Sequence, residues 1–105
     1  MTKYTTVLVT CPSEKEARRI ARRLLDGKFI ACASIINGVE SVFWWKGKVE
    51  KCRESLIIMK TTGKRLKDIE KAVKSMHSYE VPEIVALPLV WGSGDYLKWL
   101  RDSVR

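Results

Sequence analysis

The spacing of apolar and polar residues changes from that of a strand to that of a helix three times along the chain. Residues 4–11 (YTTVLVTC) are β-branched and nearly continuously apolar, as expected of a strand inside a sheet. Pro12 ends this run, and Ser13 with Glu16 then forms the S-x-x-E capping pattern of a helix start. The next apolar positions recur at helical spacing: Ala17, Ile20, Ala21, Leu24 and Leu25. Gly27 stands where a C-terminal cap belongs, so we predict a helix that ends there.

Two long strand-like runs follow, residues 30–45 and 48–61, separated only by Lys46-Gly47. A short break that contains glycine between two such runs predicts a β-hairpin. Asn37-Gly38 interrupts the first run and permits either a second turn or a bend or bulge within one strand. We favour the bend, which leaves two long strands joined by the Lys46-Gly47 turn.

The second half of the chain repeats the alternation of helix and strand. Apolar residues at helical spacing follow Gly63 and predict a second helix: Leu66, Ile69, Ala72, Val73 and Met76. Pro82 imposes an extended chain on the residue before it. Residues 83–90 (EIVALPLV) are typical of a strand, in which Pro88 favours an edge position. Residues 95–104 predict a short C-terminal helix.

The predicted order is βαβ-βαβ followed by a terminal helix. Because crossover connections are right-handed, both internal helices should cover the same face of a four-stranded sheet. This is a ferredoxin-like sandwich of the α+β class, with a long extended β-hairpin and a C-terminal helix. A chain of 105 residues supplies one core and shows no linker, so we expect a single domain spanning residues 1–105.

The predicted hairpin is too long for its sheet. Strands of about eight residues span about 26 Å, and the hairpin strands are nearly twice that length. The part that must project carries Val42, Phe43, Trp44 and Trp45. These side chains either fold back on their own domain or pack against another subunit. We favour the second arrangement, because an exposed aromatic arm promotes aggregation and a closed ring of two or three copies would bury it.

Charge is the one unusual feature of the composition, because 20 basic and 12 acidic residues give a net charge of +8. Such an excess invites a nucleic-acid hypothesis. Most of it lies in segments 14–28 and 46–75, mixed with acidic residues on predicted helices and the hairpin. The strand that would carry RNA-binding aromatics, residues 54–61 (ESLIIMKT), has none. We therefore expect no specific nucleic-acid partner and keep nonspecific binding as a third hypothesis.

Candidate metal ligands gather after the second predicted helix. His77, Glu80 and Glu83 place imidazole and carboxylate groups in one short segment, and Cys11 adds a thiol from the first strand. Imidazole with thiolate suits copper, and imidazole with carboxylate suits several divalent ions. A purely structural role for each residue stays open. A chain that supplies two or three ligands would need a neighbouring subunit or water to complete the shell.

Other chemistries find little support. The three cysteines have no CxxC spacing, which excludes a zinc finger, and their odd number favours free thiols. The chain has no glycine-rich loop of the GxxxxGK[ST] or GxGxxG type. Cys11 and His77 could meet and permit thiol chemistry, but nothing in the sequence enforces that contact. We therefore do not expect an enzyme.

Motifs throughout the chain resemble the CutA family of divalent-cation tolerance proteins. They are residues 31–48 (ACASIINGVESVFWWKGK), 77–83 (HSYEVPE), 84–88 and 95–100 (DYLKWL). The resemblance implies a ferredoxin-like protomer in a tight trimer whose long hairpins pack edge to edge. It also implies binding of divalent metals, chiefly copper, in metal tolerance. Because the implied trimer resembles that of the PII signalling proteins, a sensor with a small ligand in subunit clefts is the second hypothesis.

The chain departs from some members of that family. They carry a cysteine and a histidine at positions that match Val9 and Met76 here. Cys11 is the nearest thiol, two residues further along and therefore on the same face of a regular strand. The family's metal site thus does not carry over whole.

Together these features predict a homotrimeric protein that binds divalent metal, copper above all, and acts by binding rather than by catalysis. We expect a cytoplasmic location, since the N-terminal residues lack a signal-peptide pattern. We expect no membrane association, since the longest apolar stretches, about seven residues, fall short of the roughly 20 that a span needs.

Overall fold

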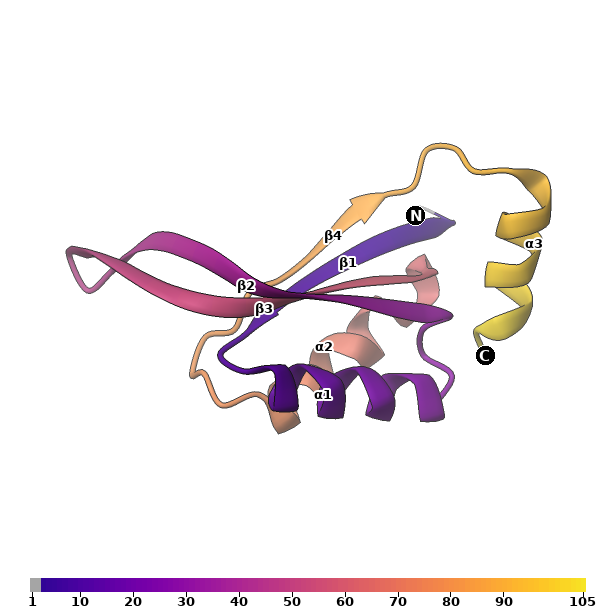
Figure 1. The fold of residues 1–105 in the computed structure, drawn as a ribbon. Coiled ribbons are helices and arrows are strands. Elements are labelled where there is room, and N and C mark those ends of the chain that lie inside the picture. The colour runs from indigo at the N-terminus through magenta and orange to yellow at the C-terminus, as the bar shows by residue number, and fades with distance from the viewer. Residues whose placement is uncertain (1–2) are drawn as a thin grey trace.

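The structure, a computed structural model, describes residues 3–105 as a four-stranded antiparallel sheet with three α-helices (Figure 1). The elements are β1 (Tyr4–Cys11), α1 (Glu14–Asp26), β2 (Cys32–Trp45), β3 (Lys48–Thr62), a 3-10 turn (Gly63–Arg65), α2 (Leu66–Met76), β4 (Ile84–Pro88) and α3 (Gly94–Ser103). The strand order is β2-β3-β1-β4. This order and the alternation of strands with helices confirm the predicted ferredoxin-like α+β fold.

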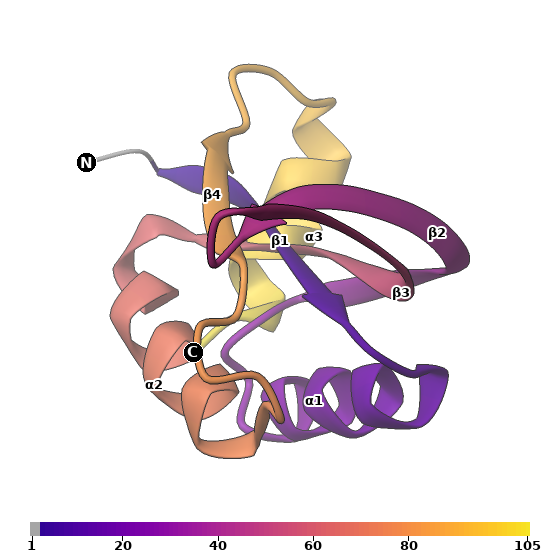
Figure 2. The same cartoon turned by 90° about the vertical axis from the view of Figure 1, so that its left-hand side faces the viewer.

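Helices α1 and α2 lie side by side against one face of the sheet (Figure 2), as the handedness of the crossovers requires. The core lies between the two layers, and alternate residues of β1 and β3 enter it. Its fully buried members include Val7, Val9, Cys11, Ile20, Leu24, Ile57, Met59, Ile69 and Val73. Helix α3 lies beyond the end of the sheet that is opposite the hairpin tip (Figure 1), where Leu100 is buried.

The limits of several elements differ from the predicted ones by a few residues. β2 begins at Cys32 rather than at residue 30, although Ile30 is buried in the core. α2 begins at Leu66, because the 3-10 turn takes the residues directly after Gly63. β4 ends at Pro88, which cannot donate a ladder hydrogen bond, and it occupies the edge of the sheet as predicted.

The start of α1 confirms half of the predicted capping pattern. Ser13 has an extended backbone, and its hydroxyl oxygen accepts a hydrogen bond from the Glu16 amide at 3.2 Å. The Glu16 carboxylate does not reach back to the cap and points elsewhere, as described below. At the other end the amide of Gly27 donates to the Arg23 carbonyl, and the left-handed residue is Lys28, with a φ of +59°.

The hairpin of β2 and β3 projects far beyond the rest of the sheet (Figure 1). β1 pairs only with residues 55–62 of β3, so residues 39–45 and 48–54 form a two-stranded arm. The pairing slips between Ile36 and Val39, where Gly38 has a φ of +72°. This slip confirms a bulge within one long strand. Lys46 and Gly47 both have positive φ and form the two-residue turn at the tip.

The aromatic residues of the arm stay in the open. In the described chain Val42 is 62% exposed, Phe43 40%, Trp44 74% and Trp45 43%. Each of these side chains therefore keeps at least 40% of its surface exposed in the described chain. Across residues 3–105, the structure has no helix long and apolar enough to cross a membrane.

Candidate functional site

Three elements bring together a thiol, a carboxylate and an imidazole where β1 ends. Cys11 is the last residue of β1, Glu16 lies in the first turn of α1, and His77 directly follows α2. One ligand atom from each residue lies within 4.8 Å of the other two. Within residues 3–105 this is the only such group of three histidine, cysteine or acidic residues. It is the candidate metal centre.

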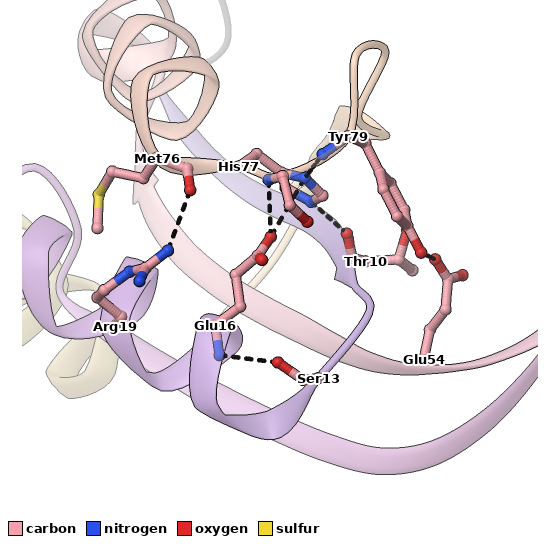
Figure 3. A network of polar contacts seen from close by, with 9 residues as sticks. Thr10, Ser13, Glu16, Arg19, Glu54, Met76, His77 and Tyr79 are labelled. Atoms are coloured by element: carbon pink, nitrogen blue, oxygen red, sulfur yellow. Dashed lines mark hydrogen bonds and ion pairs between the residues drawn. The ribbon is translucent and has the colours of Figure 1, made fainter.

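Two hydrogen bonds hold the His77 ring in one orientation (Figure 3). Nε2 lies 2.7 Å from the carbonyl oxygen of Thr10, and because a carbonyl only accepts, Nε2 carries the proton. Nδ1 accepts a hydrogen bond from the Tyr79 amide at 3.0 Å. The side chain has no exposed surface. The ring is therefore fixed with Nδ1 close to both the Tyr79 amide and Glu16.

Glu16 lies against this nitrogen. Its Oε2 atom is 3.3 Å from Nδ1 of His77 and accepts a hydrogen bond from the Ser78 amide at 3.1 Å (Figure 3). The carboxylate and Nδ1 thus lie close together, and each accepts a hydrogen bond from a backbone amide of the loop after α2. A metal ion bound at Nδ1 would take the lone pair that now accepts from the Tyr79 amide.

Cys11 completes the group from the buried face of β1. Burial, followed by the nearby charges of Glu16 and Glu54, raises the pKa of the Cys11 thiol from 9.0 to about 12. The thiol is therefore protonated at neutral pH and is a weak nucleophile. A bound metal ion would reverse this preference, since coordination deprotonates a thiol.

The donor geometry fits a metal ion that prefers nitrogen, oxygen and sulfur ligands. Two ligand atoms bound at about 2.1 Å to a tetrahedral ion lie about 3.4 Å apart, close to the separation of Nδ1 and Oε2. The bond from Nε2 to the Thr10 carbonyl is the outer-shell contact that orients metal-binding histidines. Three donors leave at least one position of a tetrahedral shell for water or another ligand.

The structure separates Glu80 and Glu83 from this group. Both are exposed on the loop between α2 and β4, where they line a groove of about 850 Å³ beside the arm. Glu83 accepts a 3.4 Å hydrogen bond from the hydroxyl of Thr10, whose carbonyl holds His77. Their role as ligands stays a prediction. Of the two positions that depart from the family pattern, Val9 is in the core and Met76 packs against it.

Glu16 was missed as a site residue because its capping role explained it locally. A second signal was available, since residues 16, 20 and 24 follow one another at i, i+4 and i+8 and so share one helix face. Ile20 and Leu24 are fully buried, and Glu16 continues that face to the end of the helix, where it is 9% exposed. A charged residue on a core face is a candidate for function.

A polar contact links the candidate site to the arm. The Tyr79 hydroxyl donates to Oε2 of Glu54 at 2.8 Å (Figure 3), and Glu54 is nearly buried at the base of the arm. Burial, with the Glu54 hydrogen bond second, raises the pKa of Tyr79. The start of the loop after α2 is therefore fixed to α1 through Ser78 and to the base of the arm through Tyr79.

Comparison with known proteins gives consistent matches. Residues 5–103 match the family model described as CutA1 divalent ion tolerance protein. The chain is 43% identical over 97 residues to the divalent-cation tolerance protein CutA of Thermus thermophilus, covering 92% of this chain and 94% of that protein. The solved structure of the Thermus thermophilus protein superposes with a TM-score of 0.95 at 41% identity and covers 97% of this chain and 99% of its own.

A plant relative is longer. The chain is 42% identical over 99 residues to the chloroplastic protein CutA 1 of Oryza sativa, which covers 94% of this chain. The match spans only 56% of the rice protein.

Proposed function

The chain belongs to the CutA1 divalent ion tolerance protein family, and from that premise we propose that it binds divalent cations, copper above all, at Cys11, Glu16 and His77. The observation that carries the proposal is the buried group of one thiol, one carboxylate and one imidazole, in which Nδ1 of His77 lies 3.3 Å from Oε2 of Glu16. Imidazole and thiolate together suit copper better than hard cations such as Mg²⁺.

The protein would act by binding rather than by catalysis. In the free protein the Cys11 thiol is protonated, because its pKa is raised to about 12, so the Cys11–His77 pair lacks the thiolate that nucleophilic catalysis needs. Glu80 and Glu83 take a supporting part in this proposal. They lie on the loop that leaves His77 and add negative charge near the site.

Copper titration by calorimetry tests the site. His77→Ala and Glu16→Gln should each weaken copper binding more than about tenfold, because each removes a ligand from a set of three. Glu16→Gln keeps an oxygen that can accept from the Ser78 amide, so the fold should persist. Glu70→Gln, on the exposed face of α2, is the matched control and should bind as the wild type does. Equal affinities in all four proteins would remove the site.

We further propose that the protein is a homotrimer whose subunits meet at Val42, Phe43, Trp44 and Trp45. The support is the exposure of this aromatic arm, which few stable monomers would tolerate. Light scattering should give the mass of a trimer for the wild type. Trp44→Ser should shift the population toward smaller species, whereas Leu25→Ser on α1 should not. A wild-type monomer at micromolar concentration would contradict the assembly.

A cytoplasmic location belongs to the same proposal. The three cysteines are free and at least partly buried, which suits a reducing compartment. Cell fractionation of a tagged chain would test this location, and recovery in a membrane or secreted fraction would contradict it.

A sensor of a small ligand is the second candidate function, and the groove beside the arm is the observation that favours it. Its volume of about 850 Å³ lies within the range of small-molecule sites.

A further inference from the structure

Nδ1 of His77 has a single lone pair, for which a metal ion and a backbone amide compete. In the structure the Tyr79 amide donates to this lone pair at 3.0 Å. A metal ion that binds Nδ1 takes the same lone pair, so the amide must leave. The contact that opposes metal binding at His77 is therefore the hydrogen bond from the Tyr79 amide.

The other contacts of His77 hold the ring in place. Its Nε2 donates to the Thr10 carbonyl at 2.7 Å, and its amide donates to the Val73 carbonyl at 2.8 Å. Arg19 of α1 donates to the carbonyl of Met76, the last residue of α2, at 3.2 Å (Figure 3). The imidazole and the end of α2 are thus fixed to β1 and α1. The segment that can yield to a metal ion is the loop after α2.

Glu54 holds this loop from the side of the arm. The Tyr79 hydroxyl donates to Oε2 of Glu54 at 2.8 Å, and Glu54 is 7% exposed. An ionised carboxylate accepts stronger hydrogen bonds than a neutral group does. The rings of Tyr79 and His77 also lie against each other, with their centroids 4.9 Å apart. The bond to Glu54 therefore stabilises the position of the residue whose amide occupies Nδ1.

We propose that Tyr79 lowers the affinity of the site for divalent metal and couples the site to the arm. Its hydroxyl bond to Glu54 stabilises the arrangement in which its amide occupies Nδ1, so a metal ion must displace both contacts. By linkage, a movement of the arm that breaks the Tyr79–Glu54 bond strengthens metal binding, and bound metal loosens the base of the arm. This coupling rests on the proposed function and regulates the same site.

Calorimetric titration with Zn²⁺, which takes nitrogen, oxygen and sulfur ligands, tests the sign of the effect. Tyr79→Phe removes only the hydroxyl and should bind zinc about fivefold more tightly than the wild type. A residue that only supported the fold would weaken binding when changed. Glu54→Gln keeps an oxygen that can accept from the hydroxyl and should not tighten binding. Tyr96→Phe, which loses a contact with the Cys32 thiol, is the matched control and should bind as the wild type does.

Residue-resolved hydrogen exchange gives a second readout, and its first part needs no metal. Without added zinc, the amide of residue 79 should exchange faster in Tyr79→Phe than in the wild type. Saturating zinc should speed exchange of the Tyr79 amide in the wild type, because that amide loses its acceptor. The Ser78 amide should stay protected, because its acceptor, the Glu16 carboxylate, has further lone pairs for a metal ion.

Equal or weaker zinc binding by Tyr79→Phe would overturn the coupling, and so would a Tyr79 amide that keeps its protection at saturating zinc. A rotation of the peptide alone, with the side chain still against Glu54, would give the first of these results. A wild type that binds neither copper nor zinc would contradict the proposed function, and the coupling with it. The two failures are therefore distinguishable, because only the first leaves metal binding intact.

Discussion

The two halves of the hairpin have similar strand character in sequence, but the structure buries the apolar residues of one half and exposes those of the other. In the half that pairs with β1, Ile57 and Met59 are fully buried beneath the helices. In the projecting arm, Val49 is 58% exposed and Trp44 is 74% exposed. The pattern of a strand is local, but burial depends on a third strand and a helix layer that only one half reaches. Apolar side chains stabilise the fold in one half of the hairpin, and in the other half they are available to contact other molecules.

The polar groups follow the same division. Near the end of β1, His77 and Glu16 are buried, and each has hydrogen-bond partners. Along the arm, Glu50 is exposed and has no ion-pair partner among the described residues. A buried polar group needs a hydrogen-bond partner within its own chain, whereas an exposed one is available to pair with a ligand or another subunit.

The strongest test of this contrast replaces one apolar residue in each half. Ile57→Ala should cost about 2–5 kcal/mol of unfolding free energy, because it leaves a cavity under both helices. Val49→Ala should cost little in the dissociated protomer and more in the assembly, because only a subunit contact would bury it. Urea unfolding at several protein concentrations measures both. A loss for Val49→Ala as large as that of Ile57→Ala at the lowest concentration would erase the distinction.

The bulge at Gly38 joins the two halves, and its backbone should resist a side chain. Gly38→Ala should cost about 1–2 kcal/mol, because alanine is strained at a φ of +72°. A Cβ there would meet only the Arg53 guanidinium at 3.7 Å, so the cost is conformational. Gly94→Ala is the control, because Gly94 has no positive φ and an open surrounding. Thermal unfolding of both variants should show a loss only for Gly38→Ala.

Alkaline pH should destabilise the folded chain, because the Cys11 thiol is buried. Cys11 is the β1 residue that pairs with Ser55, where the arm begins. The folded pKa of Cys11, about 12, lies above its ordinary value of 9.0, so the folded state keeps a proton that the unfolded chain releases. This stability is complete below about pH 9 and is lost as pH rises toward 12. The raised pKa values of Tyr79 and Tyr96 act in the same direction, beginning about one pH unit higher.

Melting temperatures between pH 8 and pH 10, roughly the interval where the thiol acts first, measure this effect. Cys11→Ala should start less stable at neutral pH and then lose stability less steeply than the wild type. Parallel curves for the wild type and Cys11→Ala would show that the thiol does not titrate between the two states.

The smallest effect is expected at the ion pair that crosses the arm. Lys51 and Glu40 are 3.7 Å apart and more than half exposed. Lys51→Gln should change the unfolding free energy by less than about 0.5 kcal/mol, because solvent screens such pairs. Urea unfolding at low and high salt measures it. A larger loss that disappears at high salt would show that the arm depends on electrostatics of its own.

Periodicity in the sequence predicted the strands, the helices and the overlong hairpin, because each of these depends on neighbouring residues. The limits of β2 and β4 were less accurate, since they depend on which residues find a partner strand. Ile30 looks like strand in sequence, yet it enters the core from the loop before β2.

The candidate site was predicted in part. Cys11 and His77 were recognised by their chemistry, and the structure brings them together. Glu16 was missed because the capping pattern with Ser13 explained it, while its carboxylate accepts from the Ser78 amide, more than 60 residues away. The groove could not be predicted at all, since it exists only where the loop after α2 returns beside the arm. Contacts between distant segments leave no period in the sequence.

The length of the arm also affects how the protein moves through solution. The described chain measures 44 × 25 × 23 Å, and its radius of gyration of 14.2 Å exceeds the roughly 13 Å of a compact chain of 105 residues. A body of that shape meets more friction than a sphere of equal mass. A single chain would therefore elute early from a sizing column, with an apparent mass above its true mass. Elution volume alone would thus overstate its mass, and sedimentation or scattering is needed to count the subunits.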